Sequence, residues 1–186
     1  MRKSTPSSEQ SLKSELRRRK KLETAALSNE YIRESDAAIE KKLLSMPEYT
    51  AAQAVFCYYS VGREAATHGI MRQTLAYGKA LALPVTLPGG EMYFARVSSL
   101  DELTPGIFGI PEPIGEPATP EPGDIIIVPA LCADLEGNRI GHGAGYYDRY
   151  LGKTDCFSAC LCRRALLEEH VPTEETDVRV SAVLTD

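Results

Sequence analysis

A continuous apolar run at residues 124–129 (DIIIVP) constrains the fold of this chain more than any other feature. A strand with one solvated face alternates apolar and polar residues, but this run shows no alternation. It is typical of a strand buried on both faces, as in a parallel sheet that helices cover on each side. Further strands are predicted at residues 54–59, 80–85, 92–97, 158–162 and 182–184.

Segments with helical periodicity alternate with these strands. A first helix is predicted from Leu12, with an apolar stripe of Leu12, Leu16, Leu22 and Ala26. A second helix starts at Ser28 or Asn29, which favour N-caps, and ends before Pro47. Its buried stripe would consist of Ile32, Ile39 and Leu43. Shorter helices are predicted at residues 64–77, 146–151 and 163–169, so the fold class is α/β.

The length of 186 residues fits one compact domain. We expect residues 1–11, which contain Ser and Pro, to be disordered, and residues 12–186 to form the single domain. Residues 104–123 form a connector rich in Pro and Gly with little periodicity. A connector of this length inside a small domain indicates a functional loop or an ordered extended segment, not a linker.

Charge and cysteine content exclude several classes of protein. The net charge of −5 argues against a general nucleic-acid binder, and the basic run at residues 17–21 favours a solvated helix face or a weak polyanion patch. No apolar run suits a membrane span or a signal peptide, so a cytoplasmic protein is expected. The spacing of Cys156, Cys160 and Cys162 matches no common zinc site, which favours buried structural thiols.

Residues 139–148 (RIGHGAGYYD) carry the strongest functional signal in the chain. Their glycines alternate with His142 and Ala144, and glycine lets a ligand approach the backbone closely. Successive amides in such a loop can form an anion-binding nest, to which a helix starting at residue 146 would add. Arg139 could supply a forked contact to a phosphate. The alternative is a glycine-rich turn, because the spacing matches neither the Walker nor the Rossmann motif.

Two carboxylates accompany this loop. Asp148 lies three residues after the last glycine, where an oxygen ligand could hold a phosphate-bound Mg²⁺. Asp177 lies in a polar turn and is either a second ligand of the same metal or a solvated turn residue. Because ligands bind beyond the carboxyl ends of strands in open α/β sheets, the position of the loop after residues 124–129 favours a phosphate site.

Together these segments resemble the 5-formyltetrahydrofolate cyclo-ligase family over nearly the whole chain, from about Lys13 to Leu184. The most specific part is DIIIVPA followed by DLEGNRIGHGAGYYDRYL, which ends at Leu151. The supporting motifs are KSELR at 13–17, YSVGREAAT at 59–67, GKALALP at 78–84 and VPTEETDV at 171–178.

The resemblance implies a single three-layer α/β/α domain of the NagB/RpiA/CoA-transferase-like kind, with a mostly parallel central sheet. It also implies closure of 5-formyltetrahydrofolate to 5,10-methenyltetrahydrofolate with ATP and Mg²⁺, releasing ADP and phosphate. The formyl oxygen would be phosphorylated first. The expected context is a cytoplasmic monomer that acts on a folate, with or without a polyglutamate tail, and has no nucleic-acid or membrane partner.

The same resemblance implies a role for each residue of the motifs. Catalysis would rest on Arg139 and Tyr146, and the metal would be held by Asp148 and Asp177. The ATP contacts would be Lys13, Arg17, Arg139, Ile140, Gly141, His142, Gly143, Ala144, Gly145, Tyr146 and Tyr147. The folate contacts would be Tyr59, Glu64, Gly143, Ala144, Gly145, Tyr146 and Tyr147. Tyr59 also lies in a predicted strand and could instead be a core residue.

Three positions depart from the family pattern. Arg163 and Leu166 stand where family members commonly carry an aromatic residue and a glutamine, and Ala144 stands where lysine or glycine is usual.

Two other functions remain as alternatives. A ligand-binding or RNA-associated relative without turnover is disfavoured by the retained motif residues Lys13, Arg17, Asp148 and Asp177. A phosphatase or kinase that uses the same loop would leave Glu64 without a role.

Overall fold

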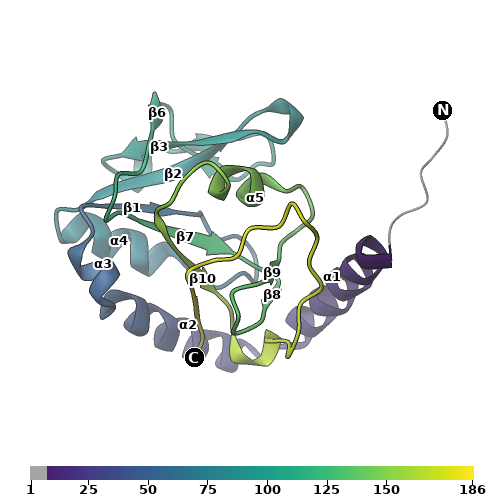
Figure 1. Ribbon diagram of the computed structural model, residues 1–186. Helices are drawn as coiled ribbons and strands as arrows, with labels where there is room; N and C mark the ends of the chain where they lie inside the picture. The colour runs from purple at the N-terminus through teal and green to yellow at the C-terminus, as the bar shows by residue number, and fades with distance from the viewer. Residues whose placement is uncertain (1–7) are drawn as a thin grey trace.

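A central sheet of seven strands, in the order β11-β10-β7-β1-β2-β3-β6, organises the molecule (Figure 1). The structure, a computed structural model, describes residues 8–186. The strands are β1 (Ala54–Cys57), β2 (Ala80–Thr86), β3 (Met92–Val97), β6 (Pro117–Ala118), β7 (Ile125–Pro129), β10 (Phe157–Leu161) and β11 (Ala182–Leu184). The strands from β11 to β2 are parallel, and β3 and β6 are antiparallel. The predicted α/β fold with a mostly parallel sheet is confirmed.

β7 contains the apolar run and lies between β1 and β10, parallel to both. Ile126 is paired with Phe56 on one side and with Ser158 on the other, and it is fully buried. The chain places β2 on one side of β1 and β7 on the other, so the strand order reverses between β1 and β7. In open α/β sheets, ligands bind in the crevice outside the carboxyl ends of strands at such a reversal.

The two faces of the sheet have different covers. The helices α2 (Asn29–Leu44), α3 (Pro47–Ala51) and α4 (His68–Ala76) pack on one face, around Ile39, Ile70 and Ile127. As predicted, Ser28 caps α2. The other face is covered by α5 (Tyr146–Leu151) and by the turn η3 (Arg164–Leu166) with the coil after it. A hairpin of β8 (Cys132–Ala133) and β9 (Arg139–Ile140) adjoins this cover, which contains less helix than the first.

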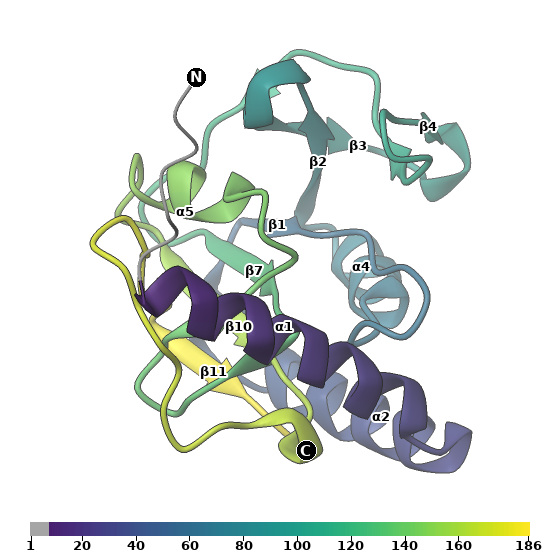
Figure 2. The same ribbon diagram turned by 90° about the vertical axis from the view of Figure 1, so that its right-hand side faces the viewer.

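The N-terminal helix α1 (Ser8–Ala26) lies on the side of the molecule that Figure 2 faces. It begins within the segment predicted to be disordered, whose residues 1–7 lie outside the described part of the chain. The predicted apolar stripe is wrong, because Leu12 and Leu22 are exposed. The buried residues of α1 are Lys13, Leu16 and Lys20, since part of the surface that this helix meets carries carboxylates.

Two predicted helices are shorter in the structure. The helix predicted at residues 64–77 begins only at His68, because the side chains of Ser60 and Thr67 accept each other's backbone N–H groups at 3.0 Å and close a loop. The helix predicted at residues 163–169 is reduced to η3, and the Glu168 N–H donates to the Ala133 carbonyl at 2.9 Å. Tertiary hydrogen bonds therefore replace helical ones in both segments.

The connector at residues 104–123 is an ordered extended segment, which is one of the two forms predicted for it. Its β4 (Thr104–Pro105) pairs with its β5 (Pro111–Glu112), and β6 pairs with β3 at the edge of the main sheet. Short turns, η1 (Pro88–Gly90) and η2 (Leu100–Glu102), lie on either side of β3. The connector thus packs beside the antiparallel end of the sheet.

Four of the five cysteines are buried thiols, as expected for Cys160 and Cys162, whereas Cys156 is only partly buried. All five are free, and the buried ones are Cys57, Cys132, Cys160 and Cys162. Burial raises the pKa of Cys132 and of Cys162 to about 12, so both thiols stay protonated and pack as small apolar groups.

Among residues 8–186, no helix combines the length and the apolar character that a bilayer span requires.

Candidate active site

A cavity of about 890 Å³ lies at the carboxyl ends of β1 and β7, where the strand order reverses. Tyr58 follows β1, Pro129 ends β7, and both contribute to the cavity wall. Every site residue predicted from the sequence lines this cavity: Lys13, Arg17, Tyr59, Glu64, Arg139, Ile140, Gly141, His142, Gly143, Ala144, Gly145, Tyr146, Tyr147, Asp148 and Asp177. Four distant segments of the chain therefore meet in one place.

The glycine loop between β9 and α5 uses backbone conformations that favour glycine. Gly143 has a φ of 104° and Gly145 a φ of 71°. Arg17 reaches this loop from α1 and donates from Nε to the Gly141 carbonyl at 3.1 Å. A Cβ on Gly143 would lie 3.4 Å from the Arg17 guanidinium carbon. The absence of a side chain at Gly143 thus allows the arginine to approach the loop closely.

Arg139 and Asp148 form an ion pair in the wall beside the loop. Nη2 of Arg139 lies 2.9 Å from Oδ1 of Asp148, and Nη1 donates to the Val178 carbonyl at 2.5 Å. The side chain of Arg139 is 4% exposed, but that of Asp148 is 30% exposed. The cation is therefore held firmly, while the carboxylate still has room for a further partner.

Lys13 pairs with two carboxylates of the C-terminal segment. Its Nζ lies 2.7 Å from Oε2 of Glu174 and also contacts Oδ2 of Asp177. Lys13 is buried, whereas the two carboxylates keep 27% and 24% of their exposure. Asp177 also accepts the Glu174 N–H at 2.7 Å. Asp177 is thus paired with the predicted nucleotide contact and is not a freely solvated turn residue.

Another part of the wall comes from the loop after β1. Glu64 accepts the Val61 N–H on Oε2 at 2.8 Å, and its Oε1 lies 3.3 Å from Nε2 of His142. The ring of Tyr59 packs edge-on against His68 with centroids 4.6 Å apart, and it also touches the core. Tyr59 therefore serves both of the roles that the sequence leaves open for its position, core packing and cavity wall.

The two tyrosines at the start of α5 have different surroundings. The hydroxyl of Tyr147 is buried and has no hydrogen-bond partner among residues 8–186. Burial raises the pKa of Tyr147 well above its ordinary value, so the phenol stays a hydrogen-bond donor. The ring of Tyr146 packs edge-on against Phe108, with centroids 6.2 Å apart. Both side chains line the cavity.

Residues 8–186 match the sequence profile of the 5-formyltetrahydrofolate cyclo-ligase family. The chain belongs to this family. It is 30% identical over 186 residues to the 5-formyltetrahydrofolate cyclo-ligase of Mycolicibacterium smegmatis, covering 91% of this chain and 94% of that relative. The Mus musculus enzyme of the same name is 26% identical over 193 residues, with 96% and 93% covered.

A solved structure supports the same assignment. The 5,10-methenyltetrahydrofolate synthetase of Aquifex aeolicus superposes with a TM-score of 0.83 and 34% identity, covering 94% of this chain and 89% of that chain. The synthetase of Mycoplasma pneumoniae, at 18% identity and a TM-score of 0.73, shares the fold. Cyclo-ligase family membership thus agrees with the resemblance that the motifs show.

The carboxylates of this family member fit a phosphate-bound Mg²⁺. In the part of the chain that the structure describes, no three His, Cys, Asp or Glu side chains form a group that could hold a metal alone. Mg²⁺ is, however, commonly held by one or two carboxylates together with substrate phosphates and water. Asp148 and Asp177 line the same cavity and are both partly exposed, which suits that arrangement.

Some residues of the cavity either lie outside the cyclo-ligase motifs, as Phe108 and Ile110 do, or lie inside a motif without a predicted role, as Arg149 does. Phe108 and Ile110 come from the connector at residues 104–123, whose composition indicates an ordered or functional segment but names no single residue. Arg149 also lines the cavity, and its Nη2 donates to the Ala144 carbonyl at 2.6 Å. The connector and α5 therefore complete a wall that sequence reasoning leaves open.

The basic run on α1 is not only a solvated face. Lys20 is buried, and its Nζ lies 2.5 Å from Glu168 and 2.8 Å from Glu23. Arg19 also contacts Glu168 at 2.7 Å, and Arg17 lines the cavity. The interpretation of this run as solvated surface is wrong for Lys20, because the acidic C-terminal segment folds back onto α1.

Proposed function

We propose that this chain catalyses the ATP-dependent closure of 5-formyltetrahydrofolate to 5,10-methenyltetrahydrofolate, with release of ADP and phosphate. The observation that carries the proposal is the single cavity in which the glycine loop, two buried cations, two carboxylates and Glu64 meet. Its volume of about 890 Å³ lies near the upper end of the range of ligand pockets. Family membership supports the conversion of the folate, and the charges in the cavity support the use of ATP.

The charges of the cavity complement those of Mg-ATP. Lys13 and Arg139 would bind phosphate oxygens, and Asp148 with Asp177 would hold Mg²⁺, which would neutralise charge on the phosphoryl group in transfer. Because Lys13 is paired with Asp177 and Arg139 with Asp148, binding would exchange partners. Phosphate would replace each carboxylate on its cation, while the carboxylates turn to the metal. The amides of the glycine loop would add donors to the phosphates.

The reaction needs activation because a formamide oxygen is a poor leaving group. The formyl oxygen would attack the γ-phosphorus, which breaks the bond to ADP and forms an iminium phosphate. The nitrogen at position 10 would then attack the formyl carbon and lose its proton, and the carbon–oxygen bond would break as phosphate leaves. Arg139 and Tyr146 would align the phosphoryl group during its transfer and stabilise its negative charge. Alignment and charge stabilisation are the main tasks of an enzyme for such a step.

The folate would lie against the wall that contains Glu64 and Tyr59. A carboxylate accepts the N–H donors that a pterin ring presents, and an aromatic ring offers a flat apolar contact. The protonated hydroxyl of Tyr147 would add a donor from within the same cavity. The two substrates would therefore meet at the glycine loop, with ATP on the side of Lys13 and the folate on the side of Glu64.

Purified protein supplied with ATP, Mg²⁺ and 5-formyltetrahydrofolate tests the proposal. The near-ultraviolet absorbance of the methenyl product should rise, and ADP should form in equal amount. Reactions without ATP, or with the metal chelated, serve as controls. Product without ADP would overturn the ATP dependence. ADP without product would favour the phosphatase or kinase alternative, and folate binding with neither product would favour a relative without turnover.

A further inference from the structure

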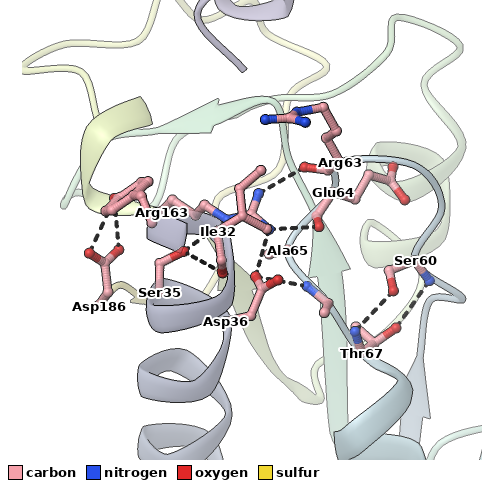
Figure 3. A network of polar contacts seen from close by, with 12 residues as sticks. Ile32, Ser35, Asp36, Ser60, Arg63, Glu64, Ala65, Thr67, Arg163 and Asp186 are labelled. Atoms are coloured by element: carbon pink, nitrogen blue, oxygen red, sulfur yellow. Dashed lines mark hydrogen bonds and ion pairs between the residues drawn. The ribbon is translucent and has the colours of Figure 1, made fainter. Parts of the chain in front are cut away.

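Arg163 is the largest fully buried side chain of the described chain, and the proposed reaction gives it no task. It lies two residues after the end of β10 and is 1% exposed. A buried charge is costly unless it is paired and hydrogen-bonded. Figure 3 shows how the guanidinium is satisfied by two segments far away in the sequence, α2 and the loop after β1.

The contacts of Arg163 converge on the loop that carries Glu64. Nε donates to Oγ of Ser35 at 3.0 Å, and Nη2 lies 2.6 Å from Oδ1 of Asp36, both on α2. Nη1 donates to the Arg63 carbonyl at 2.8 Å, and Nη2 donates to the Glu64 carbonyl at 2.9 Å. One planar group thus joins the segment after β10, the helix α2 and the two peptide groups that flank the Cα of Glu64.

Other contacts fasten the rest of this loop, residues 60–67, which we call the Glu64 loop. Asp36 accepts the Ala66 N–H on the same oxygen that binds Arg163, at 3.2 Å. The hydroxyl of Tyr58 donates to the Ala65 carbonyl at 2.6 Å. Ser60 and Thr67 close the base of the loop, as Figure 3 shows. The middle of the loop therefore depends on Arg163 and its partner Asp36.

The guanidinium of Arg163 fixes Glu64 without neutralising its carboxylate. Its positive charge is paired with Asp36, and its contact with Glu64 is through the backbone carbonyl. Arg63 is directed elsewhere, since its Nε donates to the Thr24 carbonyl at 3.0 Å. Within residues 8–186, the side-chain partner of the Glu64 carboxylate is the exposed His142, whose Nε2 lies 3.3 Å from Oε1 of Glu64. The carboxylate can therefore accept hydrogen bonds from a ligand in the cavity.

From this geometry we propose that Arg163 is a positioning residue for substrate recognition, which acts by holding the Glu64 loop. It sets the Glu64 carboxylate where it accepts the adjacent ring N–H and amino donors of a pterin-type substrate. The inference rests on the proposed function, because that function supplies the ligand of Glu64. The guanidinium of Arg163 thus acts as a polar clamp on the two carbonyls of the Glu64 loop.

The steady-state kinetics of Arg163→Met test the inference. Methionine replaces the unbranched stem of arginine with an unbranched apolar side chain, so the variant removes all four hydrogen bonds of the guanidinium. We expect the KM for 5-formyltetrahydrofolate to rise about tenfold or more, since small misplacements of a binding group have effects of this order. The KM for ATP should stay within about twofold, because Lys13 and the glycine loop do not contact Arg163.

Two further variants separate positioning from general stability. Arg163→Lys keeps a charge near Asp36 but lacks the planar fork for both carbonyls. Compared with Arg163→Met, its thermal stability should therefore be closer to that of the wild type, while its KM for the folate should stay raised. Ile39→Ala, on α2, removes core packing without touching the polar network, and it should lower stability with both KM values unchanged. An equal rise in both KM values of Arg163→Met, or equal recovery of stability and KM in Arg163→Lys, would overturn the inference.

Hydrogen exchange supplies a readout that does not depend on the reaction. Amides of residues 60–67 should exchange faster in Arg163→Met and not in Ile39→Ala, relative to the rest of each protein. Exchange that rises uniformly, or equally in both variants, would show that Arg163 does not hold the Glu64 loop. If the wild-type enzyme forms no methenyl product, the proposed function fails, and hydrogen exchange alone then decides whether Arg163 holds this loop.

Discussion

Arg163 and Lys13 are both buried cations, but they are buried among different partners. The acceptors of Arg163 include two backbone carbonyls and Asp36, whose side chain is 18% exposed. The acceptors of Lys13 are the side chains of Glu174 and Asp177, each about a quarter exposed and both lining the cavity. A cation bound to backbone holds chain segments together, whereas one bound to exposed carboxylates can change partners when a charged ligand arrives.

The comparison separates fold energetics from ligand binding. Loss of the Arg163 guanidinium would leave two partly buried carbonyls and a partly buried carboxylate without their partner, a situation that is costly in a folded protein. Loss of Lys13 would leave carboxylates that solvent in the cavity can reach, so its cost to folding is small. The region around Arg163 should therefore respond to mutation mainly in stability and folate binding, and the region around Lys13 mainly in ATP use.

The largest effect is expected for Arg163→Met on the free energy of unfolding. We expect a loss of about 3–5 kcal/mol, the range for removing one partner of a buried ion pair. Chemical denaturation at neutral pH measures it. The neighbouring Arg164→Met, on an exposed side chain, is the control and should cost less than about 1 kcal/mol. Equal losses in the two variants would contradict the contrast in burial.

Asp148→Asn tests the cation–carboxylate pairs of the cavity, which we expect to change partners when Mg-ATP binds. The variant keeps the shape of the side chain but weakens both the Arg139 contact and the proposed metal ligand, so kcat/KM for Mg-ATP should fall on the order of 100-fold. The Mg²⁺ concentration needed for half-maximal rate should rise, while the unfolding midpoint changes little. Asp155→Asn, an exposed aspartate after α5, should leave both values unchanged. Unchanged Mg²⁺ dependence in Asp148→Asn would exclude Asp148 as a metal ligand.

Lys13→Met should have a smaller effect on the same substrate. We expect the KM for ATP to rise about tenfold, which corresponds to about 1.4 kcal/mol. Stability should fall by no more than about 1 kcal/mol, because Glu174 and Asp177 remain accessible to solvent. Lys21→Met, on an exposed lysine of α1, is the control. A stability loss comparable to that of Arg163→Met would mean that the Lys13 contacts serve the fold.

The parts of the fold that follow from local pattern could be predicted from the sequence. The strand at residues 92–97 and the apolar run of β7 are predicted closely because their signals, aromatic residues in the first and β-branched residues in the second, lie within the strand itself. The helix α2 likewise carries its own cap, Ser28. The predicted cavity residues also come together, because the resemblance covers the whole motif around the glycine loop.

What the sequence could not show depends on partners far away along the chain. Arg163 contacts Asp36 across 127 residues, and no local pattern marks such a pair. The burial of Lys13 and Lys20 on α1 reverses the predicted stripe for the same reason, since their carboxylate partners lie in the C-terminal segment. Residues 64–67 of the Glu64 loop are predicted as helix because composition alone does not show that their backbone is engaged by Asp36 of α2 and by Arg163.

The smallest effect on the free energy of unfolding is expected for the pair of Lys20 and Glu168, in which Lys20 is a further buried cation to compare with Arg163. Partial burial alone would raise the pKa of Glu168, but hydrogen bonds from Lys20 and Arg19 outweigh it and hold the pKa below its ordinary value. A lowered carboxylate pKa contributes stability above about pH 4.3, the ordinary glutamate value, and this contribution is lost as the pH falls through the pKa of the folded state. Glu168→Gln should therefore cost less than about 1 kcal/mol near neutrality and nothing in strong acid.

Urea unfolding midpoints across this pH range measure the effect, with the exposed Glu169→Gln as a control that should not alter the pH dependence. Lys20 is buried like Arg163, and its partner Glu168, at 19% exposure, is as accessible as Asp36 at 18%. Among residues 8–186, however, the acceptors of Lys20 are the carboxylates of Glu168 and Glu23 and not backbone carbonyls. If Glu168→Gln cost as much as Arg163→Met, burial of the cation alone would set the energetics. A small, acid-sensitive cost would instead show that the kind of acceptor decides, since backbone carbonyls tie a buried cation such as Arg163 to the fold, whereas carboxylates alone leave a cation free to bind a ligand.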